Sequence, residues 1–335
     1  MGPVSDKPRL GAHTITLLQR AEHARVEGLD RISETRLAYR RQRHGVQVHA
    51  VWTQDLSEEQ LRVLVEFRIV QYLRVGFVEP QRLEQVLMQG QELSSSSPDD
   101  IHVVAATDDG LPLCSGLLRA PGTTDVSLRM VDRDRPRFPV EEVHGTGVFD
   151  RLRLLPQLPV VRVRELGGFV KRKVCEPLSQ VSLRAPVEVG IGLFRVATGP
   201  LALPMDALIG DLEPTVAKLN VDFFGVRPVM LRGTSPRVPE GSFLGPRYSG
   251  RQVHPFAVFT SDLTTALPRL HEVDAALDEP GLVNLLKLRS SLVPGEPSTL
   301  SWDGADDLLA AQSDAGTLAD TELHERAMHC CAYRS

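Results

Sequence analysis

A glutamate at the end of an apolar strand face is the first residue in this sequence that could do chemistry. Residues 159–166 alternate so that Val161, Val163 and Glu165 share one face of a predicted strand, opposite two arginines. A carboxylate on an apolar face is costly unless it is paired, neutralised or used in a reaction. Glu165 is therefore either half of an ion pair or a candidate for proton transfer.

An arginine occupies a similar position on a predicted helix. Ser57 and Gln60 have the spacing of a capping box, and residues 61–73 after them are apolar on most of the helix circumference. Arg68 falls on the stripe that contains Leu64 and Tyr72. An arginine there either pairs with a carboxylate or anchors a ligand, and the sequence leaves both open.

Several common catalytic and metal-binding motifs are missing. The sequence has no phosphate-binding P-loop, no dinucleotide-binding Gly-x-Gly-x-x-Gly after a strand, and no Gly-x-Ser-x-Gly elbow. The four cysteines form no disulfide framework, and the histidines near Cys330 and Cys331 match no common zinc spacing. We therefore expect no bound metal or cofactor.

The composition indicates an ordinary folded protein. The 335 residues are 42% hydrophobic and 24% charged, and the formal net charge of −5 argues against a nucleic-acid-coating protein. No apolar run approaches the roughly 18 residues that span a bilayer, and the N-terminus lacks the apolar core of a signal peptide. A cytoplasmic protein without a membrane span is the expectation.

Turn and periodicity signals predict most of the elements that must position these residues. Asp109-Gly110 between two apolar runs predicts a hairpin over residues 101–119. Further strands are expected at 207–213, 229–231 and 253–259. Pro80 and Pro214 each open a predicted helix. Glycines leave residues 174–200 ambiguous, and residues 121–150 are loop-like.

Charge divides the chain into three predicted regions. Residues 1–45 form a basic, loosely attached N-terminal arm, 46–265 the core, and 266–335 an acidic helical extension. Residues 270–335 hold 12 acidic and four basic residues, a net charge of −8, against +3 for the first 269. The basic cluster at residues 36–43 is expected to be a solvated face.

The order of these elements, with four short stretches, resembles the GNAT acyltransferase superfamily. The likeness is greatest to the branch of acyl-homoserine-lactone autoinducer synthases and long-chain N-acyl amino acid synthases, and it covers roughly residues 57–265. The stretches are Phe67-Arg68-Ile69-Val70-Gln71-Tyr72, Gly116-Leu117-Leu118-Arg119, residues 163–169 and residues 245–251. Gly168 departs from the pattern, since that branch usually has arginine there, and no glycine-rich pyrophosphate loop follows the central strand.

The resemblance implies an α+β fold, a GNAT-like mixed and mostly antiparallel sheet flanked by helices. It implies an N-acyltransferase that moves an acyl group from an acyl-CoA or acyl-carrier-protein thioester to the amine of a small molecule such as an amino acid. It needs no bound cofactor. The alternatives are a non-catalytic GNAT-like binding or scaffold protein, and a protein that binds a partner through its acidic tail.

The resemblance also implies which residues form the site. Glu165 is the candidate base or the residue that orients a water, with Asp211 and Glu213 as backup carboxylates. Arg68 and Arg119 could bind an acceptor carboxylate. The remaining candidates are Tyr72, Phe169 and Tyr248 for substrate, and Lys171, Arg172 and Lys173 for a phosphopantetheine phosphate or an acidic carrier protein. A solvated basic turn is the alternative for those last three.

Overall fold

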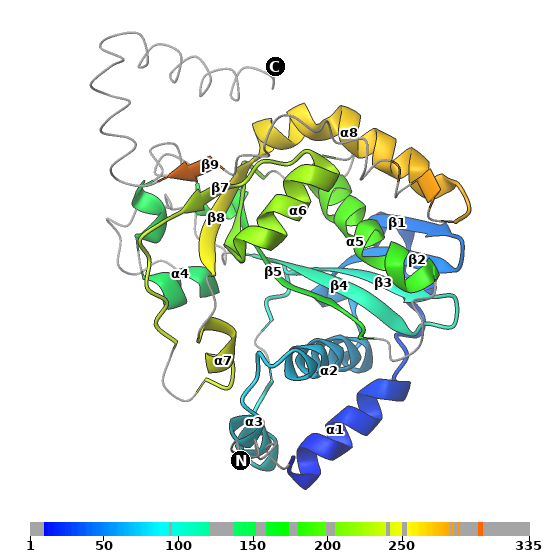
Figure 1. The fold of residues 1–335 in the computed structure, drawn as a ribbon. Helices are drawn as coiled ribbons and strands as arrows, with labels where there is room; N and C mark the ends of the chain where they lie inside the picture. The colour runs from blue at the N-terminus through cyan, green and yellow to red at the C-terminus, as the bar shows by residue number, and fades with distance from the viewer. Residues whose placement is uncertain are drawn as a thin grey trace, which may run out of the picture.

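A single mixed sheet of nine strands organises the part of the chain that the computed structural model describes. The order of the strands is β1-β2-β3-β4-β5-β6-β8-β7-β9 (Figure 1). The structure describes residues 10–93, 96–120, 137–145, 147–151, 159–173, 180–198, 205–238, 242–249, 253–281, 283–284, 287 and 301–303.

The strands and helices have the following bounds. The strands are β1 Leu37–Arg43, β2 Val46–Trp52, β3 Ile101–Thr107, β4 Pro112–Arg119, β5 Val163–Lys171, β6 Ala207–Leu212, β7 Val229–Leu231, β8 His254–Phe259 and β9 Ser301–Asp303. The helices are α1 Ala12–His23, α2 Glu58–Arg74, α3 Pro80–Met88, α4 Pro139–His144, α5 Gln180–Thr198, α6 Pro214–Phe224, α7 Gly245–Tyr248 and α8 Thr260–Asp278. The mixed α+β class expected from the sequence is confirmed.

The first five strands run antiparallel, and β5 then pairs in parallel with β6. The predicted hairpin is present as β3 and β4, and β5 lies beside it as expected. The strand begins later than predicted, because Val160–Arg162 form a turn of 3-10 helix and β5 starts at Val163. The alternation in the sequence therefore predicts the presence of the strand correctly, but it places the start of the strand too early.

Helices cover both faces of the sheet (Figure 1). Helices α5, α6 and α8 lie on one face, and α2 lies against the other, with α1 and α3 outside it. Helix α2 begins with the predicted capping box, in which Ser57 Oγ accepts from the Gln60 amide at 3.2 Å and Gln60 Oε1 accepts from the Ser57 amide at 2.8 Å. This helix has the site on its inner side.

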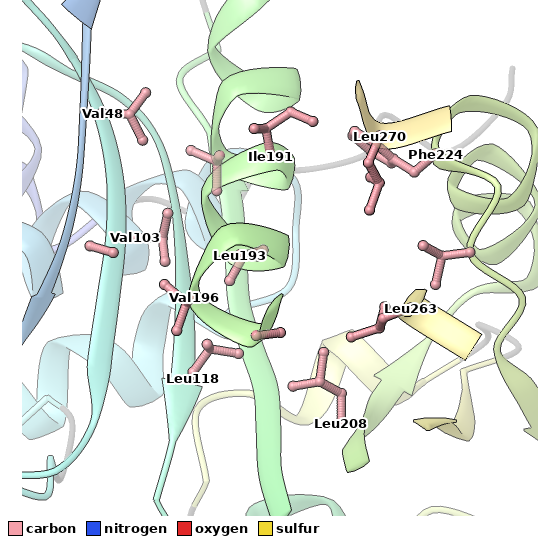
Figure 2. Packing of buried hydrophobic residues seen from close by; sticks show 14 of the residues in the cluster. Val48, Val103, Leu118, Ile191, Leu193, Val196, Leu208, Phe224, Leu263 and Leu270 are labelled. Atoms are coloured by element: carbon pink, nitrogen blue, oxygen red, sulfur yellow. The ribbon is translucent and has the colours of Figure 1, made fainter. Parts of the chain in front are cut away.

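Helix α5 occupies the segment that the sequence leaves ambiguous. Figure 2 shows its residues Ile191, Leu193 and Val196 between side chains of the sheet and those of α6 and α8. Its glycines allow close approach rather than breaking the helix. A Cβ on Gly192 would lie 2.8 Å from Val103 Cγ1, and one on Gly190 would lie 2.5 Å from the Phe224 ring. Packing thus outweighs the low helix propensity of glycine.

The described part of the N-terminal segment, from residue 10 onward, packs into the fold, which corrects the expected loosely attached arm (residues 1–45) for those residues. Strand β1 pairs along its length with β2, and α1 packs against α2 and α3. The basic cluster there is solvated in part, because Arg36, Arg40 and Arg41 are exposed as expected. Arg43 differs, since it is 8% exposed and forms ion pairs with Glu188, Asp274 and Asp278. The charge of Arg43 is therefore matched by carboxylates of α5 and α8.

The predicted boundary at residue 266 is also wrong, since it falls inside α8. Leu270, Val273 and Leu277 of this helix are buried in the main core. Farther on, β9 pairs in parallel with β7. Most of the remaining acidic extension lies outside the described residues. None of the described helices is long and apolar enough to cross a bilayer.

Helix α4 lies in a region that the sequence predicts to be loop. Phe138, Val140 and Phe149 are buried in a second core cluster with Val163 of β5. The first part of the predicted loop, residues 121–136, lies outside the described residues. The short apolar patches around Pro139 are too brief to signal a helix, yet this helix contacts the site.

Candidate functional site

Six of the predicted site residues lie on one side of the sheet, the side that α2 and α4 cover. They come from five elements: Arg68 and Tyr72 on α2, Arg119 on β4, Glu165 on β5, Asp211 on β6 and Tyr248 on α7. Glu165 is the register partner of Arg119 and is close enough to Asp211 for their charges to affect one another. The sheet therefore brings together residues that are up to 180 positions apart in the sequence.

Glu165 is a buried carboxyl group with a single described hydrogen bond. It is 6% exposed, and the amide of Val140 at the start of α4 donates to its Oε2 at 3.2 Å. No ion pair links it to Arg68 or Arg119 within the described residues, so the paired alternative from the sequence is not what the structure contains. Burial raises the pKa of Glu165 to about 8, against the opposing effect of the Arg119 charge.

Asp211 has a different environment, although it lies on the same face. Its carboxylate forms an ion pair with Arg247 and accepts a hydrogen bond from Tyr248 Oη at 2.9 Å. His144 Nε2 lies 3.7 Å from Asp211 Oδ2. Burial opposes ionisation, but the charge of Arg247 lowers the pKa of Asp211 below its usual value.

The two carboxyl groups are therefore suited to different roles. Asp211 is ionised and its oxygens are engaged by Arg247 and Tyr248, so it holds α7 against the end of β6. Glu165 can gain or lose a proton near neutral pH. A pair of carboxyl groups with separated pKa values is typical of sites that perform acid–base chemistry. Among the predicted carboxylates, Glu165 is the one that remains available.

Two arginines face this site, and no carboxylate of the described residues forms an ion pair with either of them. Arg68 is 6% exposed, and neither its guanidinium group nor that of Arg119 has a hydrogen bond or ion pair with another described residue. Their charges act on each other and on His102, which is buried and donates to or accepts from Thr53 Oγ1 at 3.1 Å. Burial first, and then the two arginines, lower the pKa of His102 to about 3, so this histidine is neutral.

Gly168 makes the space that Arg68 occupies. Ser115 pairs with Val170 and Leu117 with Gly167, so two residues of β5 oppose one of β4 in a β-bulge. Gly168 has φ +61° in this bulge, and a Cβ there would lie 2.9 Å from Arg68 Nη1. The departure from the family pattern therefore has a local reason, because a side chain at position 168 would collide with Arg68.

Strands β5 and β6 part beside this group. Their register ends at Leu166 and Gly210, and residues 167–171 pair only with β4 within the described structure. The backbone groups on that edge of β5 are therefore not used by a neighbouring described strand. Amide groups fixed in this way can polarise a carbonyl oxygen that approaches them.

Two predicted site residues lie apart from this group. Phe169 is 46% exposed and lies on the opposite side of the sheet. Its ring and Leu193 of α5 both lie within 4 Å of the position that a Cβ on Gly116 would take. Glu213 follows the last residue of β6, and its carbonyl accepts from the amides of Val216 and Ala217 at the start of α6. The sequence predicts Glu213 on one strand face with Asp211, but the strand ends too early.

The predicted basic group at residues 171–173 is divided. Lys171 and Lys173 are exposed. Arg172 is 8% exposed, donates from Nε to the Pro112 carbonyl at 2.8 Å, and stacks on the Phe67 ring. Burial lowers the pKa of Arg172. This arginine is structural, and the segment after it, 174–179, lies outside the described residues.

Three contributors to the site are not predicted from the sequence. The backbone amide of Val140 carries no signal in the sequence, because any residue other than proline supplies an amide. His144 and Arg247 are visible there only as parts of loop-like motifs. A histidine at the last residue of an unrecognised helix can be placed only once α4 is known. No cluster of three metal-ligating side chains occurs in the part of the chain that is described.

Among the comparisons with known proteins, the one with solved structures returns matches. No protein-family model matches the chain, and no curated protein matches it. Solved structures that it resembles include TofI in an apo form, with 14% identity over 66% of this chain and 96% of TofI, at a TM-score of 0.38.

Two further solved structures carry descriptive names. FeeM, an N-acyl amino acid synthase from uncultured soil microbes, shares 8% identity over 66% of this chain and 95% of FeeM, at a TM-score of 0.39. A GCN5-related N-acetyltransferase from Brucella melitensis shares 12% identity over 76% of this chain and 95% of its own length, at a TM-score of 0.38.

Proposed function

We propose that this protein is an N-acyltransferase that moves an acyl group from an acyl-CoA or acyl-carrier-protein thioester to the amine of a small molecule. The observation that carries the proposal is Glu165, a buried carboxyl group with a pKa of about 8 beside the point where β5 and β6 part. A general base is most effective when its pKa lies near the working pH.

The reaction requires one proton to leave the amine and one to reach the sulfur. The amine nitrogen attacks the thioester carbonyl, and the ionised Glu165 accepts the ammonium proton of the tetrahedral intermediate, directly or through one water. The carbon–sulfur bond then breaks, and the thiolate takes a proton from Glu165 or from solvent. The products are the amide and the free thiol, so atoms and charges balance without a redox partner.

The unpaired edge of β5 supports the carbonyl side of this reaction. Backbone amides beyond Leu166 have no described strand partner on that edge, and they are held by pairing with β4 on the other. Such amides can stabilise the developing oxyanion without reorganising during the reaction. Exposed Lys171 and Lys173 follow at the end of the strand and could meet a phosphate or an acidic carrier surface.

A test of this function starts from a mixture of thioesters and amines. Purified protein is incubated with acyl-CoA species of several chain lengths, with an acyl-carrier-protein equivalent, and with a pool of amino acids and simple amines. Free thiol is measured by a colorimetric reagent, and products by intact mass spectrometry. Amine-dependent thiol release with a matching amide mass supports the proposal. Tight carrier-protein binding without any thiol release would favour the non-catalytic scaffold instead.

A further inference from the structure

Helix α4 connects the two carboxyl groups of the candidate site. Its first turn donates the Val140 amide to Glu165 Oε2 at 3.2 Å. Its last residue is His144, whose side chain is 0% exposed and faces Asp211. The amides of a first helical turn have no partner within the helix, so the direction of α4 decides where the Val140 amide points.

The two ends of α4 are held in different ways. Phe138 and Val140 at its start are buried in the apolar cluster that contains Val163 of β5. Apolar packing has no preferred direction, so it sets how deeply the first turn lies but not where the helix points. At the other end, the Val143 carbonyl accepts from the Arg237 amide at 2.7 Å. The direction of α4 therefore depends on the polar contacts at its end.

His144 supplies the side-chain contacts at that end. Its Nδ1 lies 3.2 Å from Thr234 Oγ1, and its ring lies edge-on to the Tyr248 ring with the centroids 6.1 Å apart. Its Nε2 lies 3.7 Å from Asp211 Oδ2 and has no hydrogen-bond partner among the described residues. Because a carboxylate faces Nε2, we assign the proton of the neutral ring to this nitrogen, and Nδ1 then accepts from the Thr234 hydroxyl. A buried N–H group without a full hydrogen bond is unfavourable, so stability alone does not explain this placement.

Neighbouring groups set the charge environment of both residues. The charged groups that act on Glu165 are Arg119 of β4, Asp211 of β6 and Arg247 of α7. The titratable groups around His144 are Asp211 of β6, Tyr248 of α7 and His254 of β8. Burial raises the pKa of Glu165, and the charge of Arg119 and the Val140 amide oppose that rise. Of these influences, the Val140 amide is the one that α4 controls.

We infer that His144 is a positioning residue for proton transfer at Glu165, because it fixes the direction of α4 and so keeps the Val140 amide on the carboxyl group. This inference rests on the proposed function and deepens it by naming a residue that sets the strength of the base. His144 acts through Val140 and does not touch the substrate. Without it, the amide withdraws, Glu165 keeps its proton to higher pH, and less of the protein carries the ionised base near neutral pH.

Titration of Glu165 in the full chain tests this link without any turnover. The glutamate side-chain carboxyl carbons are labelled with carbon-13, and the Glu165 signal is identified by its absence from Glu165→Gln. His144→Phe keeps a ring and removes both nitrogens, and it should move the titration midpoint of Glu165 to higher pH by about 0.5–1 unit. His144→Gln can still donate toward Asp211 and should stay near the wild-type midpoint. An unchanged midpoint in a folded His144→Phe protein would overturn the inference.

A second variant and a control locate the effect. Thr234→Val removes the hydroxyl group beside Nδ1 at a partly exposed position, and it should move the midpoint in the same direction. This variant decides the question if His144→Phe does not fold. The control is His49→Phe, because His49 is 2% exposed on β2 and neither of its ring nitrogens has a hydrogen-bond partner among the described residues. An equal shift in His49→Phe would indicate a general loosening of the fold and refute the inference.

The pH profile of turnover distinguishes positioning from structural damage. In the thiol-release assay, His144→Phe should lower kcat at about pH 7 by about 3–10-fold with little change in KM, because a smaller fraction of Glu165 is ionised. This loss should disappear by about pH 9.5, where Glu165 is ionised in both proteins. A loss of kcat that is the same at every pH would refute the positioning role.

The two measurements also separate failure of this inference from failure of the function. A shifted midpoint in His144→Phe, with no thiol release by the wild-type protein, would retain the link between His144 and Glu165 and refute the acyltransferase. Amine-dependent thiol release by the wild-type protein, with an unchanged midpoint in His144→Phe, would retain the acyltransferase and refute the link.

Discussion

Glu165 on β5 lies directly opposite Arg119 on β4 in the antiparallel register, yet the two side chains form no ion pair. The carboxyl group is held instead by the Val140 amide at 3.2 Å. Burial therefore outweighs the favourable charge of Arg119, and the pKa of Glu165 rises to about 8. This relationship places a proton acceptor beside a guanidinium group that has no ion-pair partner among the described residues.

The first prediction concerns the pH dependence of stability. The pKa of Glu165 is about 8 in the folded protein and 4.5 ordinarily, so the folded state keeps a proton that the unfolded chain loses between those values. Wild-type stability should therefore fall as the pH rises from about 4.5 to about 8, and Glu165→Gln should escape this loss. Each unit of pKa shift corresponds to about 1.4 kcal/mol. The change in unfolding free energy between these two pH values should therefore differ between the two proteins by roughly a few kcal/mol.

Thermal unfolding of both proteins at pH 5 and pH 8.5 measures this difference. The two melting temperatures should be similar at pH 5, and the variant should be the more stable at pH 8.5. Other titrating groups are shared by the two proteins, so they cancel in the comparison. A difference that stays constant across this range would show that Glu165 does not carry a raised pKa.

The second prediction concerns the ion pair between α7 and β6. Arg247→Met should leave Asp211 buried without its main counter-charge and lower the free energy of unfolding by about 3 kcal/mol. Arg41→Met is the matched control, because its pair with Asp278 is about half exposed and should matter by less than about 1 kcal/mol. Urea unfolding of the two variants gives both numbers. Similar losses would mean that the buried pair has no special role in holding α7.

The third prediction concerns the close approach of α5 to the sheet. Gly192→Ala places a Cβ 2.8 Å from Val103 Cγ1, so overpacking should destabilise the protein by about 1–3 kcal/mol. Gly245→Ala is the control, since nothing lies within 4 Å of the Cβ that it would add. Chemical denaturation compares them. A Gly192→Ala variant as stable as the wild type would mean that α5 can move away from β3 at little cost.

The sequence predicts the local elements well and the long-range partnerships poorly. Asp109-Gly110 predicts a hairpin turn and the capping box of Ser57 predicts the start of a helix, each from neighbouring residues alone. Both features are present in the structure. Helix α5 could not be assigned from the sequence, because glycine is a poor helix former. Gly190 and Gly192 are explained only by the close packing of Phe224 and Val103 against them, which the sequence does not show. Arg43 seemed solvated because its partners are more than 140 residues away in the chain.

The same limit applies to the site. Glu165 could be identified, because the cost of a carboxylate on an apolar strand face is visible in the alternation itself. Arg172 looked like one member of an exposed basic run, and only its contact with Pro112 shows that it is structural. His144 and Arg247 depend on Asp211 of β6, and no short-range pattern links those three residues.

The most direct measurement of the central claim is amine-dependent thiol release by Glu165→Gln and a matched control. The control is Glu142→Gln, because Glu142 is an exposed residue on α4. This variant makes the same chemical change outside the site. Glu165→Gln should remain folded and should acylate the amine about 10²–10⁴-fold more slowly than wild type, the usual contribution of a positioned base. Glu142→Gln should match the wild type. Full activity in a folded Glu165→Gln protein would contradict the account, because Glu165 would then take no part in the reaction.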